Sequence, residues 1–192
     1  MTIVRPTGIK GHRDDTPDLL TWLLRAHDGG EHIAPGDGSE PLQLVDVEDV
    51  ARFLVMAIDR SLLGTFNLSG RMLVFREFLD ACKNAVRSDW KLTWIPQQFL
   101  ADQGLVSDRL LHTYAGNFPY WHPEPETQGF YRVSSEKAYR AGWRTRAFEE
   151  TAFDCLSDFY SGEFMPRPAF LSPEKEKAVL SAWADRVTPK TH

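Results

Sequence analysis

Short apolar runs alternate with amphipathic stretches through the first ninety residues, and this alternation constrains the fold more than any other feature of the sequence. The first run, 2–4, is β-branched and does not alternate with polar residues, which is typical of a buried, parallel strand. Strand-like runs at 32–34, 42–45 and 65–68 are separated by stretches with helical spacing. Strands that alternate with helices predict an α/β fold.

Two helices of this half have visible start signals. The tripeptide Thr16-Pro17-Asp18 predicts a cap, a first-turn proline and an acid that suits the helix dipole, and Gly29-Gly30 ends that helix. Asp46 is expected to cap the next helix, with Asp49 at the capping-box position. The residues expected on the buried face of this second helix are Val50, Phe53, Leu54, Ala57 and Ile58.

The second half of the chain is richer in helix and has shorter strands. Trp90, Leu92 and Trp94 alternate along one expected strand, and 129–133 forms another. Short helices are expected near 96–103 and 107–115. Ser134 is expected to cap a helix of one or two turns, and a last helix is expected to begin at Ser172-Pro173-Glu174.

Composition and charge exclude several classes of protein. The 192 residues are 42% hydrophobic and 26% charged, which are globular values. The net charge of −5 argues against nucleic acid as a partner. The longest apolar run, 53–58, is far shorter than the roughly 20 residues of a membrane span. Cys82 and Cys155 both lie on apolar helix faces, which favours a reducing cytoplasm over a disulfide framework.

Complete catalytic motifs are missing from the sequence. It contains no Gly-x-Ser-x-Gly elbow, no Walker-type phosphate loop and no Gly-x-Gly-x-x-Gly. The stretch 12–15 (HRDD) reads as a solvated loop before a helix rather than a phosphate or metal contact. A metal hydrolase that uses His112 or His122 is the weakest of the functions considered, because neither histidine has a second ligand at metal spacing. We therefore assign no metal ligand and no catalytic residue.

Aromatic residues are concentrated between 90 and 131, with Trp94, Tyr120 and Trp121 among them. Such a set lines either a small-molecule cleft or the ordinary core of a loop-rich half. The aromatic stretch 118–123 (FPYWHP) reads as a loop, which favours the cleft.

Five stretches together resemble the C-terminal half of extended short-chain dehydrogenase/reductases, the NAD-dependent epimerase/dehydratase group. They are IVRPTGIKG at 3–11, GGEHIAPGDG at 29–38, LVDVEDVA at 44–51, GTFNLSG at 64–70, and SEKA at 135–138 with the Gly142-Trp143 and 149–151 stretches that follow. The resemblance implies the last part of a Rossmann-like doubly wound sheet plus a smaller mixed α/β substrate-binding domain. It assigns 1–165 to this part and leaves 166–192 as a linker and a C-terminal helix.

The resemblance also implies what the chain lacks. The family's glycine-rich dinucleotide loop and its catalytic Ser, Tyr and Lys precede the matching segment, and these 192 residues contain no Tyr-x-x-x-Lys. NAD or NADP is therefore expected for the full-length family and none for this chain alone. The resemblance places Pro6, Thr7, Gly8 and Ile9 on the cofactor side. The residues expected on the substrate side are Lys10, Gln43, Trp94, Tyr120 and Trp121.

One departure from the family bears on the substrate. Nucleotide-sugar members carry an arginine a few residues before a His-Val-x-Asp sequence, but this chain has Leu42 there, and Asp46 replaces the histidine. An arginine binds a diphosphate bidentately and leucine cannot. We therefore expect a small-molecule substrate that is not a nucleotide sugar.

Two hypotheses of different classes remain open. The first is the substrate-binding portion of an NAD(P)-dependent enzyme that is inactive without its other half. The second is a non-catalytic module that binds a small molecule or a protein. In both, the edge of the strand at 2–4 is expected to pair with a second copy or with the missing half. The sequence leaves open whether the chain is a natural short protein, a misassigned start or a fragment.

Overall fold

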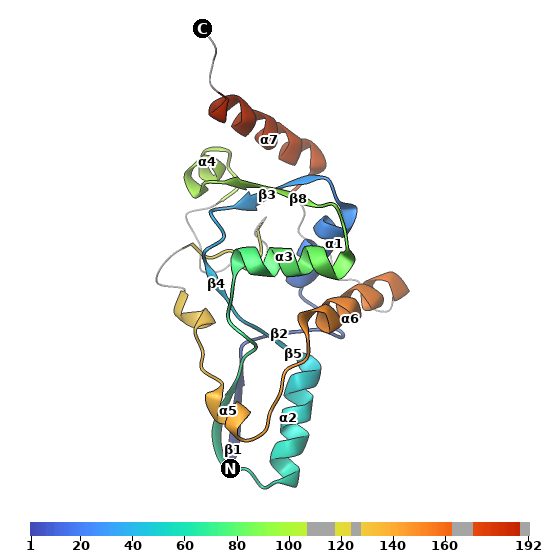
Figure 1. Ribbon diagram of the computed structural model, residues 1–192, viewed down its shortest axis with the longest axis vertical. Coiled ribbons are helices and arrows are strands. Elements are labelled where there is room, and N and C mark those ends of the chain that lie inside the picture. Colours follow the sequence, from blue (N-terminus) through green and yellow to red (C-terminus); the bar gives the residue numbers. More distant parts are fainter. Residues whose placement is uncertain (107–117, 124–127, 163–170, 189–192) are drawn as a thin grey trace.

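Parallel strand pairs form the framework of the protein in the computed structural model, which describes residues 1–106, 118–123, 128–162 and 171–188 (Figure 1). The parallel pairs are β1 (Thr2–Pro6) with β6 (Gly64–Leu68), β2 (Gly8–Lys10) with β5 (Leu44–Asp46), and β3 (Glu31–Pro35) with β8 (Lys91–Ile95). The short strands β4 (Pro41–Leu42) and β7 (Leu73–Val74) pair antiparallel. Strands and helices alternate along the first half, so the expected α/β class is confirmed.

Helices connect and cover these pairs. They are α1 (Asp18–Asp28), α2 (Val47–Asp59), α3 (Phe75–Val86), α4 (Gln97–Asp102), the 3-10 helix η1 (Gln128–Tyr131), α5 (Glu136–Arg140), α6 (Phe148–Ser161) and α7 (Pro173–Val187).

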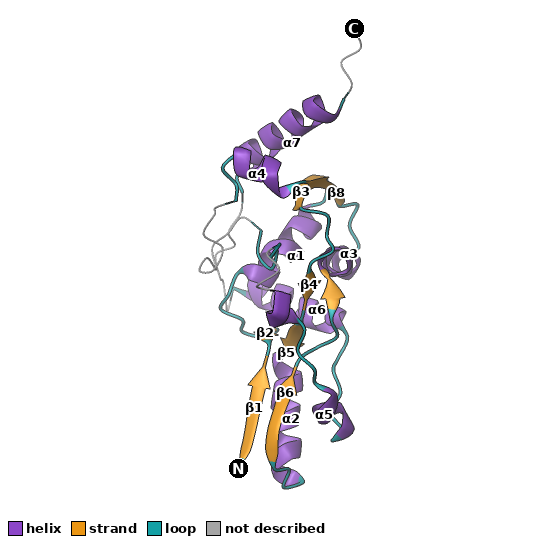
Figure 2. Ribbon diagram, turned by 90° about the vertical axis from the view of Figure 1, so that its left-hand side faces the viewer, coloured by secondary structure: helices purple, strands orange, loops and turns teal. Residues whose placement is uncertain are grey.

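Two hydrophobic cores divide the described residues. The larger lies around α1, α3 and the β3–β8 pair, where the rings of Trp22 and Phe75 meet edge to face with centroids 5.5 Å apart. The smaller lies between α2 and the β1–β6 pair, where Phe53 packs on Phe66 at 5.1 Å and on Trp143 at 6.3 Å. In Figure 2 the β1–β6 pair and α2 occupy the lower end of an elongated molecule, with β1 at its margin.

Both helices begin at or within one residue of the expected position, but only α2 has the expected side-chain cap. Asp46 caps α2 as expected, because its carboxylate accepts a hydrogen bond from the Glu48 N–H at 2.7 Å. Asp49 does not complete a capping box; it accepts from the backbone N–H of Arg146 at 3.0 Å instead. Thr16 does not cap α1 either. The helix begins after Pro17 without a side-chain cap, because the Thr16 hydroxyl is already bonded to Lys10.

Two further expectations are wrong. The stretch 129–133 does not form a strand. Residues 129–131 lie in the 3-10 helix η1, and 132–133 follow it without regular secondary structure. Leu54 and Ile58 are not on the buried face of α2, since 45% and 77% of their surface is exposed. Phe53 and Ala57 fill that face as expected. The strand expected around Trp90–Trp94 is confirmed as β8.

The C-terminal helix α7 packs against β3 through a buried ion pair. Arg25 of α1 and Glu176 of α7 form this pair, and the Glu176 carboxylate also accepts from the Ile33 N–H at 2.8 Å. His32 lies beside the same carboxylate at 3.2 Å. Farther along α7, Trp183 meets the ring of Phe99 at 5.0 Å. These contacts hold α7 on the larger core.

Within the described ranges, no helix combines the length and the apolar character that crossing a bilayer requires.

The buried Arg25–Glu176 pair predicts a strong and pH-dependent effect of Glu176→Gln. The substitution leaves Arg25 buried and unpaired, so we expect a loss of about 3 kcal/mol in the free energy of unfolding at neutral pH. Burial opposes ionisation of Glu176, but hydrogen bonds from His32 and the charge of Arg25 hold its pKa below the ordinary value. A lowered folded-state pKa stabilises above the unfolded pKa, and that stability is lost as the pH falls through the folded pKa.

Urea unfolding of both proteins between neutral and acid pH measures this effect, and the difference should shrink as the wild-type carboxylate becomes protonated. Glu174→Gln, which changes an exposed acid on the same helix, is the matched control and should have little effect. Equal stability of wild type and Glu176→Gln at neutral pH would contradict the assignment.

Candidate functional site

A buried lysine lies at the carboxyl end of β2, where ligands of open α/β sheets bind. Lys10 is 5% exposed, and its ammonium contacts the Asp14 carboxylate at 3.1 Å and the Thr16 hydroxyl at 2.5 Å. Asp14 also accepts hydrogen bonds from both the backbone N–H and the hydroxyl of Thr16, at 3.0 and 2.7 Å. The positive charge of Lys10 is therefore balanced within its own loop.

The loop that carries these residues is fixed by α6. The backbone N–H of Arg13 donates to Asp158 at 2.6 Å, and His12 lies 2.8 Å from the other oxygen of the same carboxylate. The thiol of Cys155 contacts the Gly11 carbonyl at 3.5 Å. The stretch 12–15 is a loop before the helix, as expected, with three of its four residues exposed, and these contacts fix the loop against α6.

Tyr120 lies against this loop, with its ring centre 5.5 Å from the Lys10 ammonium. The residue is 8% exposed and has a left-handed φ of 67°, which is uncommon for a bulky side chain. Its hydroxyl has no hydrogen-bond partner in the described part of the chain. Burial, and then the charges of Asp18 and Asp14, raise the pKa of Tyr120 well above its ordinary value. The phenol therefore stays protonated and serves as a neutral donor or acceptor.

Asp18 completes the group. Burial raises its pKa, and the nearby positive charge of Lys10 works in the opposite direction. We call these five residues the Lys10 cluster: Lys10, Asp14, Thr16, Asp18 and Tyr120. The cluster can present a neutral phenol and compensated charges to a ligand, but it offers no uncompensated cation.

The two predicted tryptophans pack on one glycine turn. A Cβ on Gly36 would lie 2.8 Å from Trp121 Nε1, and a Cβ on Gly38 would lie 2.4 Å from the Trp94 ring. The φ angles of these glycines, 69° and 78°, are also left-handed. Trp121 donates to Glu40 Oε1 at 2.9 Å, whereas the other oxygen of this buried carboxylate has no partner among the described residues.

Trp94 and Gln43 contact residues outside the Lys10 cluster. The Trp94 ring stacks under the guanidinium of Arg76 at 4.0 Å. The amide of Gln43 bonds both backbone groups of Val133, at 2.7 and 3.1 Å. The structure thus brings Lys10 and Tyr120 together, places Trp121 next in the chain, and leaves Gln43 engaged by backbone. Substrate contact by these residues stays a prediction.

The expected cofactor-side residues lie at the end of β1 and the start of β2. Pro6, Gly8 and Ile9 are exposed, and the Thr7 hydroxyl donates to Ser69 at 3.2 Å. Exposed positions of this kind can contact a ligand. They do not fit a whole dinucleotide by themselves, because the sequence supplies no glycine-rich loop to hold its pyrophosphate.

Leu42 and Asp46 are both engaged inside the fold. Leu42 is 1% exposed and belongs to the larger core. Asp46 accepts from the Thr151 hydroxyl at 2.6 Å in addition to capping α2. A buried leucine and a carboxylate give a diphosphate nothing to bind.

His122 of the metal-site hypothesis stacks on Tyr131, with ring centres 5.4 Å apart, and burial lowers its pKa. Across the described residues no three His, Cys, Asp or Glu side chains gather as metal ligands would. His112 and the expected helix at 107–115 lie outside those residues.

Sequence reasoning missed four acidic residues that organise the site: Asp14, Asp18, Glu40 and Asp158. Sequence reasoning could have identified Asp14 and Asp18, because acidic residues between the end of a strand and the next helix are candidate partners for a lysine at that strand end. Asp158 and Glu40 had no local signal, since their partners are 145 and 81 residues away in sequence.

Neither a known family model nor a curated protein sequence matches this chain. Solved structures do match. The UDP-glucose 4-epimerase of Thermotoga maritima, solved with UDP-glucose, is similar over 84% of this chain and 46% of its own, with 19% identity and a TM-score of 0.53. A GDP-L-fucose synthetase from Naegleria fowleri bound to NADP is similar over 83% and 46%, with 14% identity and a TM-score of 0.56.

A further similar structure is RMD from Pseudomonas aeruginosa complexed with NADPH, over 83% of this chain and 48% of that one, with 16% identity and a TM-score of 0.51. The chain has the fold of part of these proteins. It spans about half of their length. The parallel α/β fold class expected from the sequence is thereby confirmed, and these identities bear on the fold alone.

The two neighbouring aromatic residues 120 and 121 predict opposite responses to substitution. Tyr120→Phe removes a buried hydroxyl without a partner, so stability should stay within about 0.5 kcal/mol or rise. Trp121→Phe removes the donor to Glu40 and leaves that carboxylate buried and unsatisfied, which should cost about 2 kcal/mol or more. Urea unfolding measures both, and a marked loss in Tyr120→Phe would mean that its hydroxyl is bonded in the folded protein.

Proposed function

We propose that this chain is the substrate-binding portion of an NAD(P)-dependent protein of the epimerase, dehydratase or reductase kind. The observation that carries the proposal is the Tyr120 hydroxyl, which is buried beside Lys10 at the carboxyl end of β2 and has no partner among the described residues. A buried polar group without a partner costs stability, so a ligand that supplies the partner is favoured. The likeness to structures solved with UDP-glucose, NADP or NADPH supports the choice of class.

The substrate that suits this site is small, uncharged and rich in hydroxyl or carbonyl groups. Asp14 already balances the charge of Lys10, and the raised pKa keeps Tyr120 neutral. An anionic diphosphate would find no free cation in the cluster, and it would meet Leu42 and Asp46 where an arginine would be needed. We therefore propose that the ligand is not a nucleotide sugar.

The chain by itself is proposed to be inactive. In the family that the sequence resembles, a tyrosine with a lysine four residues later moves the proton, and no such pair occurs here. Tyr120 cannot replace it, because its pKa is raised rather than lowered. Pro6–Ile9 would contribute one side of a cofactor site that needs further residues, so NAD or NADP is proposed for the complete protein only.

A reducing compartment such as the cytoplasm suits the two cysteines, which are both free and buried. Burial raises the pKa of Cys155 to about 12, so its thiol stays protonated and unreactive near neutral pH. The negative net charge continues to argue against nucleic acid as a partner.

Ligand titration of the full chain tests the proposal. We expect no saturable fluorescence change with NADH and no thermal stabilisation by UDP-glucose. D-glucose at millimolar concentration, used as a small neutral polyol, should raise the melting temperature by a few degrees through binding to the folded state. The shift should disappear in Tyr120→Phe and persist in Tyr160→Phe, which alters an exposed tyrosine on α6.

Binding of NADH by the chain alone would refute the proposed division of the cofactor site. Stabilisation by UDP-glucose but not by D-glucose would refute the size and charge of the proposed ligand. A D-glucose shift that Tyr120→Phe leaves intact would move the site away from the Lys10 cluster.

A further inference from the structure

The ring of His32 lies between two oxygen atoms that accept hydrogen bonds. Its Nε2 is 2.9 Å from the carbonyl oxygen of Gly29, and its Nδ1 is 3.2 Å from Oε2 of Glu176. A neutral imidazole carries a proton on one nitrogen and a lone pair on the other, so it can donate to only one of these oxygens. Both contacts are hydrogen bonds only when both ring nitrogens carry protons, which makes the ring an imidazolium.

The surroundings of His32 favour the doubly protonated ring. Burial opposes ionisation of the Glu176 carboxylate, but its contacts with His32 and Arg25 hold its pKa below the ordinary value, so it is an anion near neutral pH. Gly29 is the C-cap residue of α1, and the dipole of a helix favours a cation at that end. Arg25 acts in the opposite direction, because it is a second cation on the same carboxylate.

Other charged groups near the ring come from the elements packed around it. Asp89, just before β8, adds an acid, because a Cβ on Gly29 would lie 2.5 Å from its Oδ1. Glu31 and Lys91 pair in register next to His32, and the alternation of a strand turns their side chains to the opposite face of the β3–β8 pair. The remaining charged residues at the end of α1 and the start of α7 are exposed: His27, Asp28, Glu174, Lys175 and Lys177.

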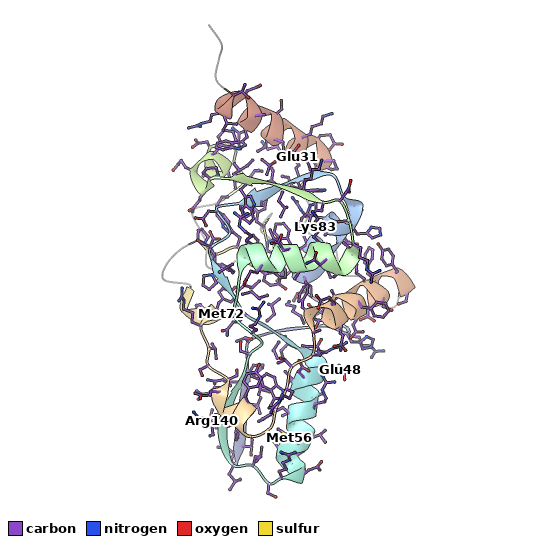
Figure 3. The ribbon with its side chains drawn as sticks, viewed as in Figure 1. Glu31, Glu48, Met56, Met72, Lys83 and Arg140 are labelled. Atoms are coloured by element: carbon purple, nitrogen blue, oxygen red, sulfur yellow. The ribbon has the colours of Figure 1, made fainter. Side chains whose placement is uncertain are left out.

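The carboxylate that His32 contacts is the polar attachment of α7 to the rest of the fold. Oε1 of Glu176 accepts from Arg25 and from the Ile33 N–H, whereas Oε2 has His32 as its partner in the described part of the chain. In Figure 3 the labelled Glu31, the residue before His32, lies directly below α7 and far from Met56 of α2. The protonation state of one ring therefore bears on the contact that holds this helix.

We infer that His32 is a pH-operated latch for α7: the doubly protonated ring holds the helix on β3, and loss of one proton loosens it. A neutral ring directs a lone pair at an oxygen of Gly29 or Glu176, in a site where the Glu176 side chain is 9% exposed and water replaces the lost donor poorly. The docked state binds the second proton more tightly than the undocked state. Its contribution is therefore present at lower pH and is lost as the pH rises. At acid pH the Glu176 carboxylate is itself protonated, so the latch holds between the titration of a carboxyl and that of an imidazole.

Hydrogen exchange of the full chain between about pH 6 and about pH 8 tests the inference, because an imidazole titrates in this range. Rates are compared as protection factors, which removes the intrinsic effect of pH on exchange. We expect the protection of the α7 amides to fall about tenfold as the pH rises, the effect of losing one charge-assisted hydrogen bond. The amides of α3, which lies in the same core, should keep their protection. An equal fall in α3 would indicate a change in global stability and overturn the latch.

His32→Gln is the diagnostic variant, because an amide donates to one of the two oxygens at every pH and does not titrate. The protection of α7 should become independent of pH in this variant. His27→Gln, which changes an exposed histidine of α1 beside the exposed Asp28, is the matched control and should keep the wild-type fall. A fall that persists in His32→Gln would assign the effect to another group and refute the latch. Circular dichroism confirms that each variant is folded.

Nitrogen-15 NMR of the histidine rings gives a second readout that needs no variant. We expect protons on both ring nitrogens of His32 at about pH 6, and loss of the second proton in step with the protection of α7 as the pH rises. A ring with a single protonated nitrogen at about pH 6 would contradict the two hydrogen bonds. Loss of the second proton that leaves the α7 amides unchanged would show that the ring does not hold the helix.

Discussion

The carboxylate of Asp46 is the interaction on which the arrangement of this protein depends. It ends β5, caps α2 through the Glu48 N–H, and accepts the Thr151 hydroxyl of α6, so one side chain joins a strand and two helices. Its strand neighbour in register is Lys10. Gly11 follows with a φ of 121°, and a Cβ there would approach Asp46 Oδ2 to 3.1 Å, so the chain can pass this point only as glycine.

The loop that leaves Gly11 is consequently directed toward α6, and the Lys10 cluster is assembled from residues that this loop carries. The cluster buries one ammonium beside two carboxylates, and Asp14 pairs with the Lys10 charge. The Tyr120 phenol is a neutral group of the cluster whose hydroxyl has no hydrogen-bond partner among the described residues. A site of this kind recognises neutral oxygen atoms rather than phosphate, which distinguishes it from a site built around arginine.

Local rules could predict much of the fold and little of the site. The spacing of apolar residues located α1, α2 and β8, because amphipathic periodicity is decided within a few residues. The capping role of Asp46 was predictable for the same reason. The stretch 129–133 was not, since its conformation depends on Gln43, which bonds both backbone groups of Val133 from a distant part of the chain. Thr16 failed as a cap because Lys10, a buried ion, engaged its hydroxyl.

The sequence by itself determined the α/β class, the parallel character of the first strand, the absence of a complete dinucleotide loop and the wide apolar surface of α2, all of which follow from short-range pattern and residue type. Only the tertiary structure decided that Lys10 meets Tyr120, that Asp158 holds the intervening loop, and that Leu54 and Ile58 stay exposed. The reason is that these contacts join residues far apart in sequence, where burial and charge compensation, rather than local propensity, select the partner.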